Sequence, residues 1–167
     1  MSDRVVILEI TRIEAAHLAA LVTQFLELLD TTEDSHPADD PAIARLVPDA
    51  YRDDPEAAQE FRDVTQTDLI ARRIDDAGVL LSTLGTVERV PGDAPLDDPR
   101  FTEVVTITID SDESRAWMRT LAAVRLVLAE RLGIQVEDDR AEDDPRFGIY
   151  DWLGYRLDGL VRAISGD

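Results

Sequence analysis

The chain has 167 residues, the length of one ordinary domain. Its 36 acidic and 17 basic residues give a net charge of −19, yet 44% of its residues are apolar, too many for a disordered acidic tail. It contains no cysteine, which excludes disulfides, thiolate catalysis and a cysteine redox switch. The longest apolar run near the start, at 5–8, is too short for export or membrane insertion, so we expect a cytoplasmic protein without a membrane partner.

A strand followed by a helix is predicted over residues 4–30. The β-branched and aliphatic run 4–10 is typical of a strand. Thr11 and Glu14 have the three-residue spacing of a capping box, in which each side chain bonds the other residue's backbone N–H at the start of a helix. The apolar stripe of this helix consists of Ala15, Leu18, Leu21, Val22, Phe25, Leu28 and Leu29.

The same design returns 99 residues later, over 104–132. Here Asp110 and Glu113 take the places of Thr11 and Glu14, and Gly133 is a natural C-terminal cap. The apolar stripe consists of Trp117, Leu121, Val124, Leu128 and Leu132. We expect the two strands to pair, within one chain or across a dimer, because an isolated strand leaves its backbone groups unbonded. Internal duplication and the common form of any capped strand-to-helix junction both explain the similarity.

Central helices are predicted over 41–84 and a C-terminal helix over 147–164. The central pattern is marked by Phe61, Ile70, Ile74, Ala77, Leu81 and Leu84, and a second capping-like start at Thr65 raises the alternative of a break there. The C-terminal stripe consists of Ile149, Leu153, Leu157, Leu160 and Ile164. Segments 85–103 and 133–146 are the expected loops.

Asp-Asp-Pro occurs four times, at 39–41, 53–55, 97–99 and 143–145. An aspartate before proline is a good N-cap, because proline presets the first helical φ and the carboxylate accepts from free backbone N–H groups. We therefore interpret the repeats as helix starts or turns rather than as a ligand motif.

Both histidines follow a glutamate by three residues, Glu14 with His17 and Glu33 with His36. Two such pairs, with a further glutamate from each of two other helices, build the metal site of helical di-iron proteins. The pattern is weak here, because Glu14 is taken by the capping box and the second pair lies in a stretch that should not be helical. No EF-hand, phosphate loop or nucleophile elbow is present. We expect no catalytic residue, metal or cofactor, and keep a metal-dependent enzyme as an alternative.

Two surfaces are candidates for contact with other molecules. Arginines on the second repeat helix form a local positive stretch that could touch nucleic acid: Arg115, Arg119, Arg125 and Arg131. The candidate contacts for a protein partner are an aromatic group and part of the acidic segment 137–144: Tyr150, Trp152, Tyr155, Asp138 and Asp139. Trp152 is one position off the stripe, which fits either the margin of the core or an interface.

The run Leu-Val-Pro-Asp-Ala-Tyr-Arg-Asp-Asp-Pro-Glu-Ala-Ala at 46–58 and the run Tyr-Asp-Trp-Leu-Gly-Tyr at 150–155 resemble an actinobacterial family of oxidative stress regulators, the AosR family, long classed as a domain of unknown function. The stretch 126–133 also resembles this family, and the lysine-free, arginine-rich composition agrees with an actinobacterial protein. The resemblance implies transcriptional regulation under oxidative stress. The chain departs from a thiol sensor because it has no cysteine pair.

We therefore expect a mainly α, α+β single domain over 1–167, with about five amphipathic helices and a small two-stranded β element. The expected function is that of a non-enzymatic regulator that acts through protein–protein contacts. If it regulates transcription, the charge favours a sigma factor or an RNA polymerase component as partner over DNA, with direct DNA binding through Arg115–Arg131 as the alternative. A homodimer is expected because Leu26 and Leu80 lie outside the single stripes.

Overall fold

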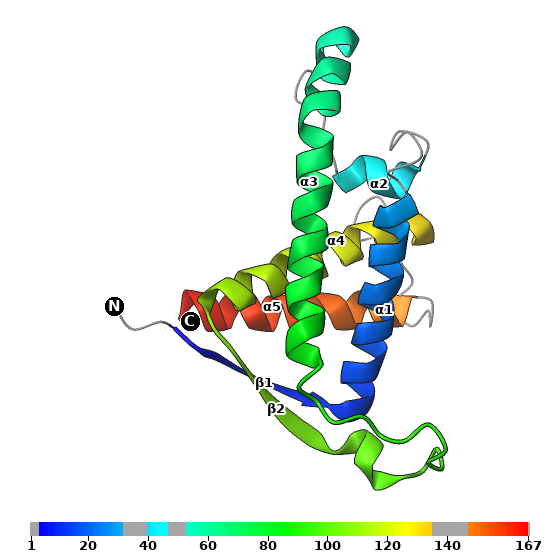
Figure 1. Cartoon of the computed structure of the whole chain (residues 1–167), viewed down its shortest axis with the longest axis vertical. Coiled ribbons are helices and arrows are strands. Elements are labelled where there is room, and N and C mark those ends of the chain that lie inside the picture. Colours follow the sequence, from blue (N-terminus) through cyan, green and yellow to red (C-terminus); the bar gives the residue numbers. More distant parts are fainter. Residues whose placement is uncertain (1–3, 32–39, 47–52, 135–146, 167) are drawn as a thin grey trace.

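The computed structural model describes residues 4–31, 40–46, 53–134 and 147–166 (Figure 1). It is a mostly helical chain with a two-stranded antiparallel sheet, as the sequence predicts. In this part of the chain no helix has the length and apolar content needed to cross a bilayer. The elements in order are β1 (Val6–Thr11), α1 (Arg12–Thr31), α2 (Pro41–Leu46), α3 (Pro55–Leu84), the 3-10 helix η2 (Pro99–Thr102), β2 (Val104–Ile109), α4 (Ser111–Leu132) and α5 (Gly148–Ser165).

The two strands pair with each other within the chain, which confirms the expected partnership. Val6 lies opposite Ile109, and Leu8 lies opposite Ile107. The two strand-helix units are 99 residues apart in the sequence, so Leu8 of the first unit corresponds to Ile107 of the second. Because these two residues also lie opposite each other in the sheet, the two units are arranged symmetrically about this pair. The side chains of Val6, Ile10 and Ile107 point into the core, as alternation along a strand requires.

Both expected capping boxes are formed. The N–H of Thr11 donates to the carboxylate of Glu14 at 2.9 Å, and the N–H of Glu14 donates to the Thr11 hydroxyl at 3.2 Å. Asp110 and Glu113 make the same reciprocal pair at the start of α4. Each box bonds backbone donors that the first turn of a helix would otherwise leave free, so the direction in which each helix leaves its strand is set locally.

Three of the four Asp-Asp-Pro repeats cap helices, as predicted. Asp40 accepts from the N–H of Ala42 at the start of α2, Asp54 caps α3, and Asp98 caps η2. The fourth repeat, at 143–145, lies outside the described residues.

Helix α3 runs from Pro55 to Leu84 without a break at Thr65. The Thr65 hydroxyl donates to the carbonyl of Phe61 at 2.8 Å, so it is bonded inside the helix instead of capping a new one. The described part of the chain therefore has four long helices, and α3 alone is about 45 Å long. Its N-terminal end extends beyond the other elements in Figure 1.

Helix α4 lies at the centre of the helical layer and contacts α1, α2, α3 and α5. More of its surface is therefore buried than one stripe predicts, and the additional buried positions carry small side chains such as Ser114, Ala123 and Ala129. The indole N–H of Trp117 donates to the Thr83 hydroxyl of α3 at 2.8 Å, and Thr83 donates in turn to the Leu80 carbonyl. A buried indole with a bonded N–H joins α3 to α4 without leaving a polar group unsatisfied.

Two details of the predicted stripes differ in the structure. Ile149 is 55% exposed, whereas Tyr150 beside it is buried in a second small core with Ile134 and Phe147. Leu80 is fully buried and Leu26 packs against the main core, because α3 contacts both α1 and α4 and so needs two apolar faces. These two leucines therefore no longer support the expected dimer.

Truncation of Leu80 should destabilise the fold strongly. We expect Leu80→Ala to lower the free energy of unfolding by about 2–5 kcal/mol, because the side chain is 0% exposed and the change leaves a cavity. Val79→Ala is the matched control, since the Val79 side chain on the same helix is 37% exposed. Urea denaturation followed by circular dichroism measures both, and a Leu80→Ala loss no larger than that of the control would contradict this packing.

Candidate functional site

The Glu14 carboxylate lies where β1, α1 and α5 meet, and it accepts four hydrogen bonds. Its Oε2 atom accepts from the Thr11 N–H at 2.9 Å, from the Thr11 hydroxyl at 3.0 Å and from Nη2 of Arg156 at 3.0 Å. Its Oε1 atom accepts from the indole N–H of Trp152 at 3.0 Å. One side chain thus closes the cap of α1 and binds two residues of α5.

These donors hold Glu14 in its charged form. Partial burial by itself would raise the pKa of the carboxyl group, but the Thr11 backbone N–H, the Trp152 indole, the Thr11 hydroxyl and the positive charge of Arg156 together outweigh it. The pKa of Glu14 falls from 4.5 to about 2 as a result. A carboxylate that is ionised at every physiological pH and has its oxygens occupied is suited to fastening helices together rather than to transferring protons.

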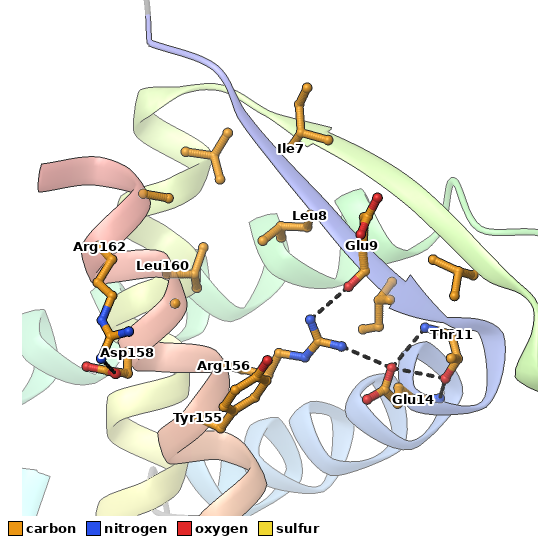
Figure 2. A pocket seen from close by; sticks show the side chains of 15 residues that line it. Ile7, Leu8, Glu9, Thr11, Glu14, Tyr155, Arg156, Asp158, Leu160 and Arg162 are labelled. Atoms are coloured by element: carbon orange, nitrogen blue, oxygen red, sulfur yellow. Dashed lines mark hydrogen bonds and ion pairs between the residues drawn. The ribbon is translucent and has the colours of Figure 1, made fainter. Parts of the chain in front are cut away.

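Arg156 extends this cluster to the backbone of β1. Its Nη1 atom donates to the carbonyl of Glu9 at 2.7 Å, while Nη2 reaches Glu14, as Figure 2 shows. Arg156 is not among the residues that the sequence pattern singles out. Its position four residues after Trp152 places both side chains on one face of α5, and this spacing was the available signal.

A groove of about 670 Å³ runs between β1 and α5 beside this cluster (Figure 2). One wall is β1 from Val6 to Thr11, and the other is formed by α5 residues that include Tyr155, Gly159 and Ala163. A Cβ atom added to Gly159 would have no heavy atom within 4 Å, so this glycine opens the groove instead of packing tightly.

The groove follows the free edge of β1. The N–H of Arg12, just after β1, donates to the carbonyl of Glu103, just before β2, and this pair continues the register of the two strands. Because hydrogen-bonded pairs alternate along an antiparallel ladder, the even-numbered residues of β1 point their backbone groups toward β2. The odd-numbered residues point theirs away, as the bonds from the Thr11 N–H to Glu14 and from Arg156 to the Glu9 carbonyl confirm. In the sheet as described, β1 pairs only with β2.

A comparison with protein-family models matches residues 1–164 to a family described as a domain of unknown function, DUF2017. The chain belongs to the DUF2017 family. Searches of curated proteins and of solved structures found no match to it.

In this DUF2017 chain the three aromatic residues singled out as partner contacts lie in different settings. Tyr150 is 6% exposed, and the Arg125 guanidinium stacks on its ring at 4.0 Å, so it belongs to the core. Trp152 is partly buried against the main core and bound to Glu14. Only Tyr155, at 73% exposed, is free to meet another molecule, and it borders the groove. Asp138 and Asp139 lie outside the described residues.

The four arginines proposed for nucleic acid all contact other residues of the DUF2017 chain. Arg119 pairs with Asp76 of α3 at 3.0 Å, and Arg131 pairs with Asp40 at 2.8 Å. Arg115 forms an exposed pair with Asp112, and Arg125 stacks on Tyr150 as described above. Two of the four arginines on α4 are therefore paired with acidic residues from outside this helix, and Arg115 is paired within it.

The Glu-x-x-His pairs are not assembled into a metal site in the described chain. Glu14 is surrounded by donors, His17 is exposed, and Glu33 and His36 lie outside the described residues. Among the described residues no group of three or more potential ligands comes together.

The lowered pKa of Glu14 predicts a specific dependence of stability on pH. A carboxyl group whose pKa is lower in the folded state stabilises the fold above its unfolded pKa, and this contribution is lost as the pH falls from 4.5 toward 2. We expect Glu14→Gln to reduce the loss of unfolding free energy between pH 7 and pH 3.

Glu113→Gln is the matched control, because Glu113 closes the equivalent capping box of α4. Urea titrations of the three proteins at a series of pH values measure the effect. Parallel curves for the wild type and Glu14→Gln would show that Glu14 does not hold its charge in this way.

Proposed function

We propose that this chain is a non-enzymatic regulatory protein that acts through protein–protein contacts. The observation that carries the proposal is the outer face of the β1–β2 ribbon. Three aliphatic side chains are largely exposed there, Ile7 at 67%, Val104 at 58% and Val5 at 54%. Val5 and Ile7 are neighbours at one end of this face, and Val104 lies opposite Thr11 at its other end. A sheet face that exposes aliphatic side chains at both ends can be covered by another protein.

The charged groups of the described chain favour binding over catalysis. The best-formed cluster, Glu14 with Arg156 and Trp152, uses its donors and acceptors to connect β1, α1 and α5. Three of the four arginines singled out on α4 are paired with acids, which favours a protein partner over DNA for a chain with a net charge of −19. A metal-dependent enzyme and direct DNA binding are the competing proposals.

The finer proposal draws on the resemblance to oxidative stress regulators. It is that the chain regulates transcription by holding a sigma factor or an RNA polymerase component, without a cysteine switch. A negatively charged chain associates faster with a basic surface, and added salt slows that association. A homodimer is a separate proposal, tested by sedimentation of the purified chain over a range of concentrations.

A photo-crosslinking experiment tests the contact surface. A photoreactive phenylalanine analogue is placed at Ile7 or at Val104, with Val79 of α3 as the matched exposed aliphatic control, and the proteins are irradiated in the cells of origin. We expect one and the same protein to be captured from both ribbon positions and not from Val79, because the ribbon face is the proposed contact. Mass spectrometry identifies the product.

Calorimetry with the captured protein then measures affinity. Ile7→Asp should weaken binding at least about tenfold, because it places a charge in an apolar contact. Capture of no protein from either ribbon position, or an unchanged affinity of Ile7→Asp, would refute the proposal. Capture of nucleic acid instead would favour the DNA-binding alternative.

A further inference from the structure

We propose that the groove between β1 and α5 binds an extended, basic segment of a partner protein as a third strand on β1. The inference rests on the proposed function, since it gives the mode in which a protein partner is held.

The backbone of β1 offers the hydrogen bonds that an added strand needs. Ile7, Glu9 and Thr11 are the odd-numbered residues of β1, which point N–H and C=O groups away from β2, and the N–H of Thr11 is already bonded to Glu14. The Glu9 carbonyl is bonded to Arg156, so pairing with a new strand would centre on Ile7 and end at Glu9. Addition of a strand to an exposed sheet edge is a common way of binding an extended peptide.

The floor of the groove leaves room for that strand. Gly159 and Ala163 are one helical turn apart on α5 and line the groove opposite β1. Every second side chain of an added strand would lie over these two small residues. A larger residue at Gly159 would enter the groove, because the space where its Cβ would be is open.

The exposed side chains along β1 set the chemistry of the ligand. Arg156 is paired with Glu14 and Arg162 with Asp158, whereas the exposed carboxylate of Glu9 has no ion-pair partner among the described residues. Side chains directly opposite each other on paired strands contact one another. The ligand should therefore carry an apolar residue opposite Ile7 and an arginine or lysine opposite Glu9, two positions apart.

Charge also favours a partner protein over a second copy of this chain. If β1 paired with β1 of a second copy, with the two Ile7 residues opposite each other, Glu9 of one chain would lie opposite Val5 of the other. This pairing would also bring together two chains that each carry a net charge of −19. A basic segment from another protein meets an acidic molecule and an unpaired carboxylate instead.

A peptide selection tests the proposal. A displayed library of random 12-residue peptides is selected against the full chain, and the affinities of enriched peptides are measured by fluorescence polarisation. We expect enrichment of an apolar residue two positions from an arginine or lysine. Gly159→Val should weaken binding about tenfold or more, because it fills the groove. Gly78→Val is the matched control, since Gly78 is a helical glycine of α3 that also faces open space.

A charge exchange tests the register. Glu9→Arg should weaken the selected peptides, and replacing their basic residue with aspartate should restore binding to this variant. The proposal is overturned if no such pattern is enriched, if Gly159→Val and Gly78→Val bind equally well, or if Gly159→Val abolishes a dimer of the wild-type chain in sedimentation.

The same variants separate this inference from the proposed function. If a protein captured from Ile7 binds Gly159→Val and Glu9→Arg as tightly as the wild type, regulation by protein contact stands and the strand-addition mode fails. If the selected peptides depend on Gly159 and Glu9 while no protein is captured in cells, the groove is a strand-binding site and the regulatory proposal fails.

Discussion

The Glu14 carboxylate joins the strand end, α1 and α5 at one point. Within 3.0 Å this group gathers a backbone and a hydroxyl donor from the end of β1 and the Trp152 and Arg156 side chains of α5. Trp152, Arg156, Gly159 and Ala163 follow one another at helical spacing, so fixing the first two also sets which way the last two face. This carboxylate therefore closes the start of α1 and adds polar bonds to β1 and α1 to the apolar packing that already orients α5 through Leu153 and Leu160.

The local part of this arrangement was predictable from the sequence, and the long-range part was not. The Thr11–Glu14 and Asp110–Glu113 boxes involve residues three apart, and their chemistry requires no other element. Arg156 lies 142 residues from Glu14 along the chain, and nothing in its own neighbourhood names that partner. Tertiary contacts of this kind follow from how the helices pack, which local patterns of residues do not reveal.

The same distinction explains the other differences between pattern and structure. One apolar stripe was assumed for the central helix, but α3 contacts helices on two sides and therefore buries Leu80 as well. The positive stretch on α4 was summed along the sequence, whereas Asp76 and Asp40 reach Arg119 and Arg131 from other elements. A sum of charges over a window describes a surface only when no other element supplies counter-charges.

The charge of the chain and its open strand edge have to be considered together. Proteins protect edge strands by placing charged side chains on them, since an exposed apolar edge pairs with its own copies. On β1, Arg156 occupies the carbonyl of Glu9, and the Glu9 carboxylate and the net charge of −19 oppose association of like chains. The Arg156 bond limits pairing to the part of β1 before the Glu9 carbonyl, and the negative charge does not oppose a strand that carries positive charge. The edge is thus protected against the most abundant wrong partner, a second copy, while the backbone at Ile7 is left open to a ligand of opposite charge.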